Sequence, residues 1–137
     1  MSAAIFSLIG IVAGGSLQYF FTRHLDSQKY HRELRTKSYT DYLKSVSDQA
    51  NLGIQPKSPE TREMFAKTAD AKARICLYGS VAAIGAFAEF ERLGATMNTA
   101  EQCAAFTRMV AIMRSDSGSK QDVVLKDLEA VLIGVRR

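Results

Sequence analysis

The sequence predicts an all-α protein in which a long N-terminal transmembrane helix continues into a cytoplasmic bundle of four or five helices. Two observations support this prediction. The 19 residues 3–21 carry no charged side chain, and as a helix they would rise about 28 Å, close to the ~30 Å hydrocarbon core of a bilayer. The only two prolines, Pro56 and Pro59, lie close together, so the rest of the chain is free of strong helix breakers.

Charge divides the chain into three segments, which are a transmembrane helix over 1–22, a basic stalk with the first bundle helix over 23–53, and the remainder of the bundle over 58–137. The formal net charge is +4, and the bases gather directly after the apolar span. We expect them to contact anionic lipid head groups, at about 1 kcal/mol for each base near the surface. The predicted lipid-contacting residues are Arg23, Lys29, Arg32, Arg35 and Lys37.

The same bases predict the orientation of the span. Lys and Arg accumulate on the cytoplasmic side of membrane helices, and the opening residues MSAA are uncharged. We therefore expect a single-pass protein of the bacterial inner membrane, with its N-terminus outside and its bundle in the cytoplasm. A cleaved signal peptide is the alternative. It is disfavoured because the chain has no basic region before the span and no small-x-small cleavage site before Arg23.

Periodicity and helix caps outline the first two bundle helices. The first helix continues to about residue 52, where Asn51-Leu52-Gly53 supplies a stop. Its predicted core stripe consists of Tyr39, Tyr42, Leu43, Val46 and Ala50. Ser58 and Pro59 open the second helix as cap and first-turn proline. Its predicted buried face consists of Phe65, Ala69, Ala73, Cys76 and Leu77.

Three further helices complete the predicted bundle. Ser80 caps a helix that ends at Gly94, with Val81, Ile84, Phe87 and Ala88 on its helical stripe. Thr99 and Gln102 form a capping box for the next helix, whose core stripe is Cys103, Phe106, Val110 and Met113. Ser119 with Asp122 opens the last helix, in which we expect inward packing of Val124, Leu125, Leu128, Val131 and Leu132.

Small residues recur along the span at helical spacing. Gly10 and Gly14 form a GxxxG sequence, which allows close approach of helix backbones in lipid. We expect homo-oligomerisation through this face, which either surrounds a pore or contacts only a partner helix. The predicted oligomer or pore face consists of Ala3, Ser7, Gly10, Gly14 and Gln18.

Other site types are not expected. Cys76 and Cys103 lie on apolar helical stripes, which predicts reduced core residues without metal-ligand spacing, and no cofactor is expected. Tyr30 lies among the stalk bases, as in some nucleic-acid-binding segments. The neighbouring tyrosines of the first helix are better explained as core residues, so nucleic acid is an unlikely partner.

The chain shows no catalytic constellation. His24 and His31 lie seven positions apart, on one helical face, without a nucleophile motif near them. There is no phosphate-binding glycine loop. An Arg-x(4–6)-His motif, the signature of one helical ribonuclease superfamily, is absent because Arg23 precedes His31 by eight positions. We therefore do not expect an enzyme.

Two stretches resemble a pattern found in small bacterial membrane-anchored proteins: Arg74-Ile75-Cys76-Leu77-Tyr78-Gly79-Ser80 and Met113-Arg114-Ser115-Asp116. In them we expect Arg74 to be the partner of a carboxylate or of another helix, and Gly79-Ser80 to form a turn and cap. The overall plan is similar to membrane accessory proteins of RNA-targeting CRISPR systems, which assemble as pores that compromise the inner membrane during phage infection.

This resemblance implies a self-associating inner-membrane protein that acts as an oligomeric pore or membrane effector in antiviral defence. A membrane-anchored adaptor that binds a protein partner without pore activity is the alternative.

Overall fold

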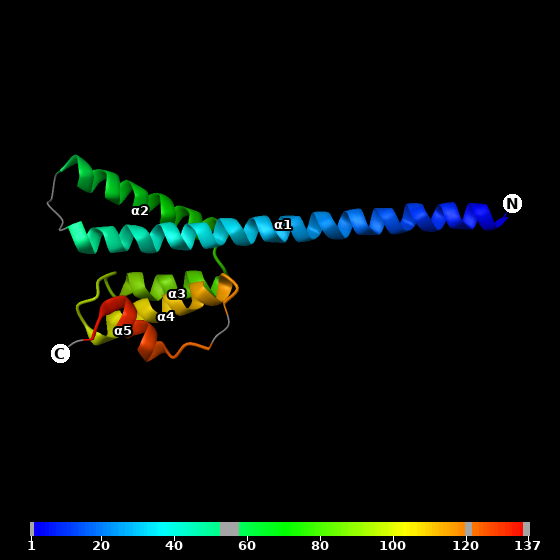
Figure 1. The fold of residues 1–137 in the computed structure, drawn as a ribbon. Helices are drawn as coiled ribbons and strands as arrows, with labels where there is room; N and C mark the ends of the chain where they lie inside the picture. The colour runs from blue at the N-terminus through cyan, green and yellow to red at the C-terminus, as the bar shows by residue number, and fades with distance from the viewer. Residues whose placement is uncertain (1, 53–57, 120–121, 136–137) are drawn as a thin grey trace. The chain divides into compact units, whose positions relative to one another are not determined.

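The computed structural model describes residues 2–52, 58–119 and 122–135, and these residues form five helices without strands (Figure 1). The helices are α1 (Ser2–Leu52), α2 (Pro59–Tyr78), α3 (Val81–Arg92), α4 (Ala100–Asp116) and α5 (Leu125–Ile133). The predicted all-α fold, with a long apolar N-terminal helix followed by a helical bundle, is confirmed. The chain divides into two units, Met1–Glu33 and Leu34–Arg137.

The first unit is the N-terminal part of α1. Every side chain described over 2–33 is exposed, including Phe6 at 74% and Ile11 at 69%. This part of the protein contains one stretch long and apolar enough to cross a membrane, and 0% of it is buried. A signal sequence and the core helix of a soluble protein can have the same length and composition.

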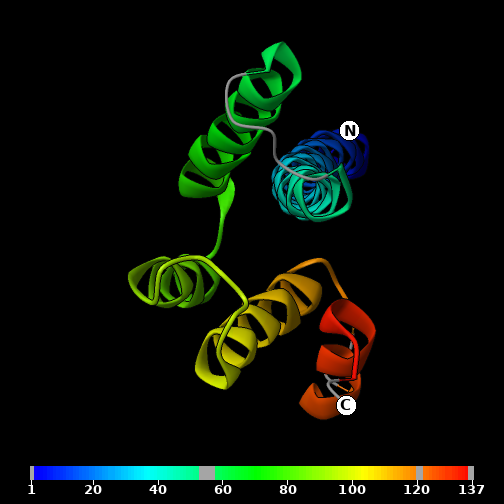
Figure 2. The ribbon, with the colours of Figure 1, turned by 90° about the vertical axis from the view of Figure 1, so that its left-hand side faces the viewer.

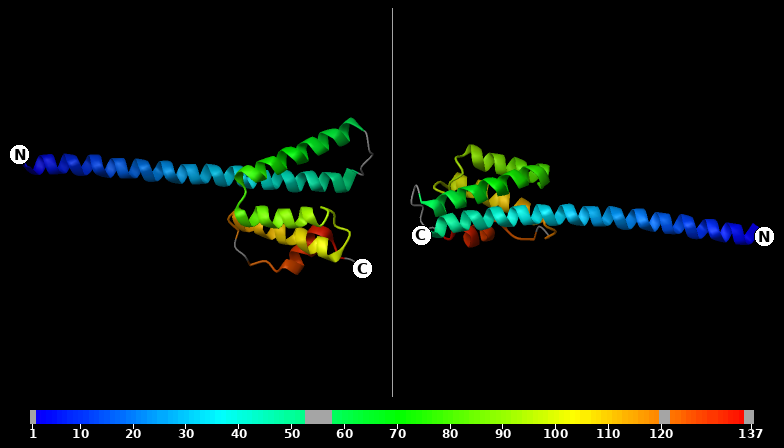
Figure 3. Two further views of the ribbon diagram at one scale, coloured as in Figure 1. Left: turned by 180° about the vertical axis from the view of Figure 1, so that it is seen from behind. Right: turned by 90° about the horizontal axis from the view of Figure 1, so that it is seen from above.

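The second unit packs the C-terminal part of α1 and helices α2–α5 around one apolar core (Figure 2). Tyr42 meets Phe87 edge to face with ring centroids 4.7 Å apart, and Phe90 lies 5.2 Å from Phe106. Helix α4 contributes more buried side chains than any other helix, and it lies beside α3 in the left view of Figure 3. The buried apolar residues of the core are Tyr39, Tyr42, Ala71, Ile75, Ala83, Phe90, Ala105, Phe106, Met109, Val110 and Met113.

The predicted helix starts are confirmed where a side chain caps the first turn. Ser58 accepts a hydrogen bond from the Thr61 amide, and Pro59 occupies the first helical position. Ser80 caps α3 by accepting from the Ala83 amide. Thr99 and Gln102 make the predicted capping box of α4. Each cap satisfies amide groups that the first turn of a helix leaves without a partner.

The core stripes predicted for α1 and α4 are also confirmed. Tyr39 and Tyr42 are each 2% exposed, and Leu43 and Val46 pack partly buried against them. All four residues predicted for α4, from Cys103 to Met113, are buried. The side chain of Ala50 and the predicted stop at Gly53 lie outside the described residues.

The buried face predicted for α2 is wrong. Phe65 is 54% exposed and Leu77 is 75% exposed, and the other three predicted residues, Ala69, Ala73 and Cys76, are exposed as well. The residues that α2 buries are Thr61, Ala71 and Ile75. Helix α2 carries apolar residues on two faces, and the face that turns inward is the one whose Ala71 and Ile75 join the apolar core.

The predictions for the ends of the bundle need a similar correction. Helix α5 starts at Leu125, after Val124, which provides no side-chain cap, rather than at Ser119. Only Leu128, among the predicted inward residues of α5, packs partly buried against the core. The remaining four are exposed: Val124, Leu125, Val131 and Leu132. On α3, Val81 and Ile84 are likewise exposed, whereas Phe87 packs partly buried against the core.

Candidate functional site

The predicted oligomer face lies on the exposed surface of the first unit. A Cβ atom placed on Gly10 or on Gly14 would meet no other atom within 4 Å. These glycines are therefore not required by contacts inside the chain. The five residues of the face, Ala3, Ser7, Gly10, Gly14 and Gln18, are all exposed and helical, and their spacing of three and four places them along one side of the helix.

Four of the five predicted lipid-contacting bases are exposed. Within the first unit Lys29 lies 4.0 Å from Glu33, and both side chains are exposed to solvent, so this pair adds little stability. Arg35 differs from the other bases because its Nε donates a 2.7 Å hydrogen bond to the carbonyl oxygen of Tyr78. Helix α2 has no basic residue in its own last turn, and Arg35 supplies positive charge at that end.

A polar network links α1, α3 and α4 through one carboxylate. The Tyr39 hydroxyl donates to Asp116 Oδ2 at 2.7 Å, and Ser80 Oγ donates to the same oxygen at 2.5 Å. The amide nitrogen of Ser80 donates in turn to the Tyr39 hydroxyl oxygen at 3.2 Å. Ser80 thus caps α3 and joins it to the other two helices. Burial, followed by the hydrogen bond to Asp116, raises the pKa of Tyr39.

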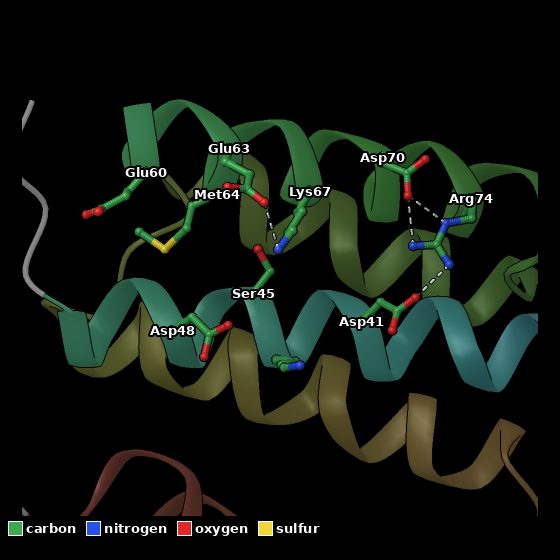
Figure 4. A pocket seen from close by; sticks show the side chains of 10 residues that line it. Asp41, Ser45, Asp48, Glu60, Glu63, Met64, Lys67, Asp70 and Arg74 are labelled. Atoms are coloured by element: carbon green, nitrogen blue, oxygen red, sulfur yellow. Dashed lines mark hydrogen bonds and ion pairs between the residues drawn. The ribbon is translucent and has the colours of Figure 1, made fainter. Parts of the chain in front are cut away.

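A second polar site lies between α1 and α2 and centres on Arg74 (Figure 4). Its Nη1 lies 2.8 Å from Asp41 on α1, and its Nη2 lies 2.9 Å from Asp70 on α2. The expectation that Arg74 is a carboxylate partner between helices is confirmed. Because a guanidinium presents several donors in a fixed plane, one side chain satisfies both acids.

Two turns further along α1, hydroxyl and amide groups continue this polar contact. Thr68 accepts a 2.8 Å hydrogen bond from Gln49 Nε2 and shares a short hydrogen bond with Ser45. Thr68 also donates to the Met64 carbonyl at 2.9 Å. The contact of α2 with α1 is therefore largely polar, which explains why its apolar stripe is not the buried side.

These side chains border a pocket of about 440 Å³. Its lining carries more acids than bases, and Figure 4 shows the side chains of α1 and α2 facing each other across it. The lining residues are Asp41, Lys44, Ser45, Asp48, Glu60, Glu63, Met64, Lys67, Asp70 and Arg74. Lys67 pairs with Glu63 at 3.3 Å on the exposed rim.

The structure brings together residues that the sequence alone did not group. Asp41 and Asp116 were not predicted as site residues, and each is the acid that joins two or more helices. The sequence signal for Asp41 is an acid at the boundary of an apolar helical stripe, and Asp116 ends the stretch Met113–Asp116 that carries the resemblance. Cys76 is exposed and Cys103 is buried, so the prediction of two core cysteines is half wrong.

Among the described residues, no group of three or more His, Cys, Asp and Glu side chains is placed to hold a metal ion. His24 pairs with Gln28 at 3.1 Å within the first unit. Comparisons of the chain with family models, with curated proteins and with solved structures find no match.

Proposed function

We propose that this protein crosses the bacterial inner membrane once and self-associates there. The observation that carries the proposal is the apolar stretch of α1, which is uncharged over 3–21 and 0% buried within the protein. A continuous apolar surface of this length is costly in water and stable in hydrocarbon, where a helix satisfies its own backbone groups. The bases that follow it support a topology with the N-terminus outside and the bundle in the cytoplasm.

The proposed contact between copies is the small-residue face of the span. Apolar attraction between helices is weak in lipid, so association depends on close packing and on polar contacts such as the one Gln18 offers. The openness around Gly10 and Gly14 supports this role, since neither glycine is explained by a contact within the chain.

Replacement of either glycine tests the contact. Gly10→Ile or Gly14→Ile is expected to reduce the oligomer to a monomer in native mass spectrometry of the full chain in detergent. Ser16→Ile is the matched control, because it enlarges a small residue on the opposite side of the same helix and is expected to preserve the oligomer. Unchanged masses for both glycine variants would contradict the proposed contact.

A pore lined by the same face is the finer form of the proposal, with a role as membrane effector in phage defence. Ser7 and Gln18 make this side the least apolar part of the span. Expression is then expected to depolarise the membrane and admit dye, and Gln18→Leu is expected to reduce both effects. Full membrane potential at high expression would exclude the pore while leaving self-association in place.

A membrane-anchored adaptor is the second candidate, and the pocket beside Arg74 favours it. A pocket of about 440 Å³ with charged walls is of a size found for ligand sites. For an adaptor, a stoichiometric protein partner is expected to copurify with the full chain and to be lost on Asp48→Lys. The span is then expected to be replaceable by an unrelated transmembrane helix.

A further inference from the structure

The outer side of α2 is an uncharged strip within the second unit. At about 100° per residue its members share an arc of roughly 120°, and the buried residues Ala71 and Ile75 lie on the opposite side. The outer strip consists of Phe65, Ala66, Ala69, Ala73, Cys76 and Leu77, all of them exposed. Exposed apolar helix faces of this kind mark contact surfaces.

An apolar groove borders the outer strip on one side. It has a volume of about 320 Å³ and lies between α2 and α3. Its walls include Cys76 of the strip, and Ile84 and Phe87 of α3. Leu77 lies on the other edge of the outer strip and is 75% exposed. The protruding side chain of Leu77 (the knob) and the apolar groove (the hole) therefore lie at the same height along α2, on opposite edges of the outer strip.

The two edges of the outer strip are also flanked by residues of opposite charge. Lys72 flanks the outer strip on the groove side, and Asp70 flanks it on the Leu77 side, each about 20° outside the apolar arc. Lys72 lies 2.6 Å from Glu91 of α3, and Asp70 pairs with Arg74. A two-fold axis parallel to α2 brings each flank of one copy against the opposite flank of the other, so that the Lys72 flank meets the Asp70 flank.

We propose that the outer strip of α2 binds a second copy of this chain, with the two α2 helices parallel and Leu77 of each copy filling the α2–α3 groove of the other. This inference rests on the proposed membrane span, which holds the copies in one membrane. The parallel arrangement follows from the strip itself, because Leu77 and the groove lie at the same height on α2 and only parallel helices bring them together. A two-fold interface has to be self-complementary, and the strip has its knob and hole, and its two charges, on opposite flanks.

The size of the strip sets the strength of the contact. One helix pair buries less than the roughly 800 Å² per partner of a standard interface. Such a contact is weak between free molecules in solution. Copies held in one membrane meet at a high effective concentration, which converts a weak contact into a stable one. Alanines at the centre of the strip permit close approach of the two helices.

Crosslinking of the full chain in nanodiscs or native membranes tests the proposal. Parallel helices hold Cys76 at the same height as its own counterpart, and the other cysteine, Cys103, is buried. Mild oxidation is expected to give a crosslinked dimer that Cys76→Ser abolishes. In the Cys76→Ser background, Ala66→Cys is expected to restore the crosslink, since parallel helices also bring these positions together. Lys126→Cys in that background gives the collisional baseline.

Leu77→Asp tests the groove, because it would bury a charge in an apolar site. This variant is expected to lower the yield of the Cys76-crosslinked dimer at least about tenfold. Val131→Asp changes a similarly exposed residue on α5 and is expected to leave the yield unchanged. Equal yields for wild type and Leu77→Asp, or baseline yield for Ala66→Cys, would overturn the proposal.

A cysteine in the span separates this inference from the proposed function. Ser7→Cys in the Cys76→Ser background reports contact between spans, because cysteine is close to serine in size and Ser7 lies on the proposed contact face. If Ser7→Cys crosslinks while the Cys76 and Ala66 positions stay at baseline, the α2 contact is refuted and self-association through the span stands. If none of the three positions crosslinks, both proposals are refuted.

Discussion

The Tyr39 hydroxyl donates to Asp116 across 2.7 Å, and these two residues lie 77 positions apart in the sequence. Asp116 is the last residue of α4, and its other hydrogen bond goes to the residue that caps α3. One carboxylate therefore holds the C-terminal part of α1 against the end of one helix and the start of another.

Removal of the Tyr39 hydroxyl tests this junction. Tyr39→Phe deletes one hydrogen bond to a charged acceptor and leaves the Ser80 amide without its side-chain partner. The free energy of unfolding is expected to fall by about 1–3 kcal/mol. This corresponds to several degrees in the thermal midpoint of the bundle, which circular dichroism in micelles measures. Tyr30→Phe, at an exposed position on the same helix, is the control, and an equal shift for both variants would contradict the role of Tyr39.

The tyrosines of the core also predict the alkaline limit of stability. Burial raises the pKa of Tyr39 and of Tyr42 above the ordinary value of 10.0. The unfolded chain then loses these protons at lower pH than the folded chain. Their contribution to stability is present below pH 10 and falls as pH rises above it.

Tyrosinate absorbance checks that prediction directly. Tyr39 and Tyr42 are expected to ionise above pH 10 in the folded chain. Tyr39→Phe and Tyr42→Phe are each expected to remove one late-titrating group. A high-pH phase of the absorbance titration that is unchanged in both variants would show that these two side chains are not buried.

The packing of α4 predicts a contrast between two phenylalanines. Phe106 is 4% exposed and packs against Phe90, so Phe106→Ala is expected to cost about 3–5 kcal/mol. Phe65 is 54% exposed, and Phe65→Ala is expected to change the thermal midpoint of the monomer little. A loss at Phe65 as large as that at Phe106 would restore the original expectation that this face of α2 is core.

Gly79 occupies the tight connection between α2 and α3. A Cβ atom there would lie 2.5 Å from the backbone oxygen of Ile75, a group that cannot move without disturbing the end of α2. Gly79→Ala is expected to destabilise the bundle by about 1–3 kcal/mol. The matched control is Gly85→Ala on α3, where a Cβ atom meets nothing within 4 Å and where alanine favours the helix. Equal effects at the two positions would contradict the close approach.

The Arg74 cluster predicts a coupling energy rather than a large single loss. Arg74 is 28% exposed and Asp41 is 37% exposed, so solvent weakens their attraction. A double-mutant cycle between Arg74→Ala and Asp41→Ala is expected to give about 0.5–1.5 kcal/mol. The cycle for Lys67 and Glu63 on the exposed rim is expected to give less, and the reverse order would contradict the bridging role of Arg74.

Local features of the fold follow from the sequence, whereas the choice of buried face does not. The caps at Ser58, Ser80 and Thr99 depend on residues three positions apart, so their spacing alone predicts them. The inward side of α2 depends on partners 19–33 positions away, such as Asp41 for Arg74 and Gln49 for Thr68. An apolar pattern on α2 cannot reveal that α1 offers it polar groups.

The site residues divide in the same way. The apolar span and the bases after it are visible because membrane insertion selects residue type over a long continuous segment. The junction at Asp116 and the pocket beside Arg74 are assembled from single residues on different helices. The two stretches that carry the resemblance contain Arg74, Ser80 and Asp116. Neither stretch shows which side chains meet, because that follows from packing.

The mass of the full chain in a membrane mimetic, measured by native mass spectrometry, tests self-association most directly. Self-association through the span predicts a mass of two or more times 15.1 kDa. This mass is expected to fall to that of one copy in Gly14→Ile and to persist in Ser16→Ile. A ring of six or more copies would support the pore, and two copies would support an anchoring dimer. A single copy for the wild-type chain at every concentration would contradict the proposed function.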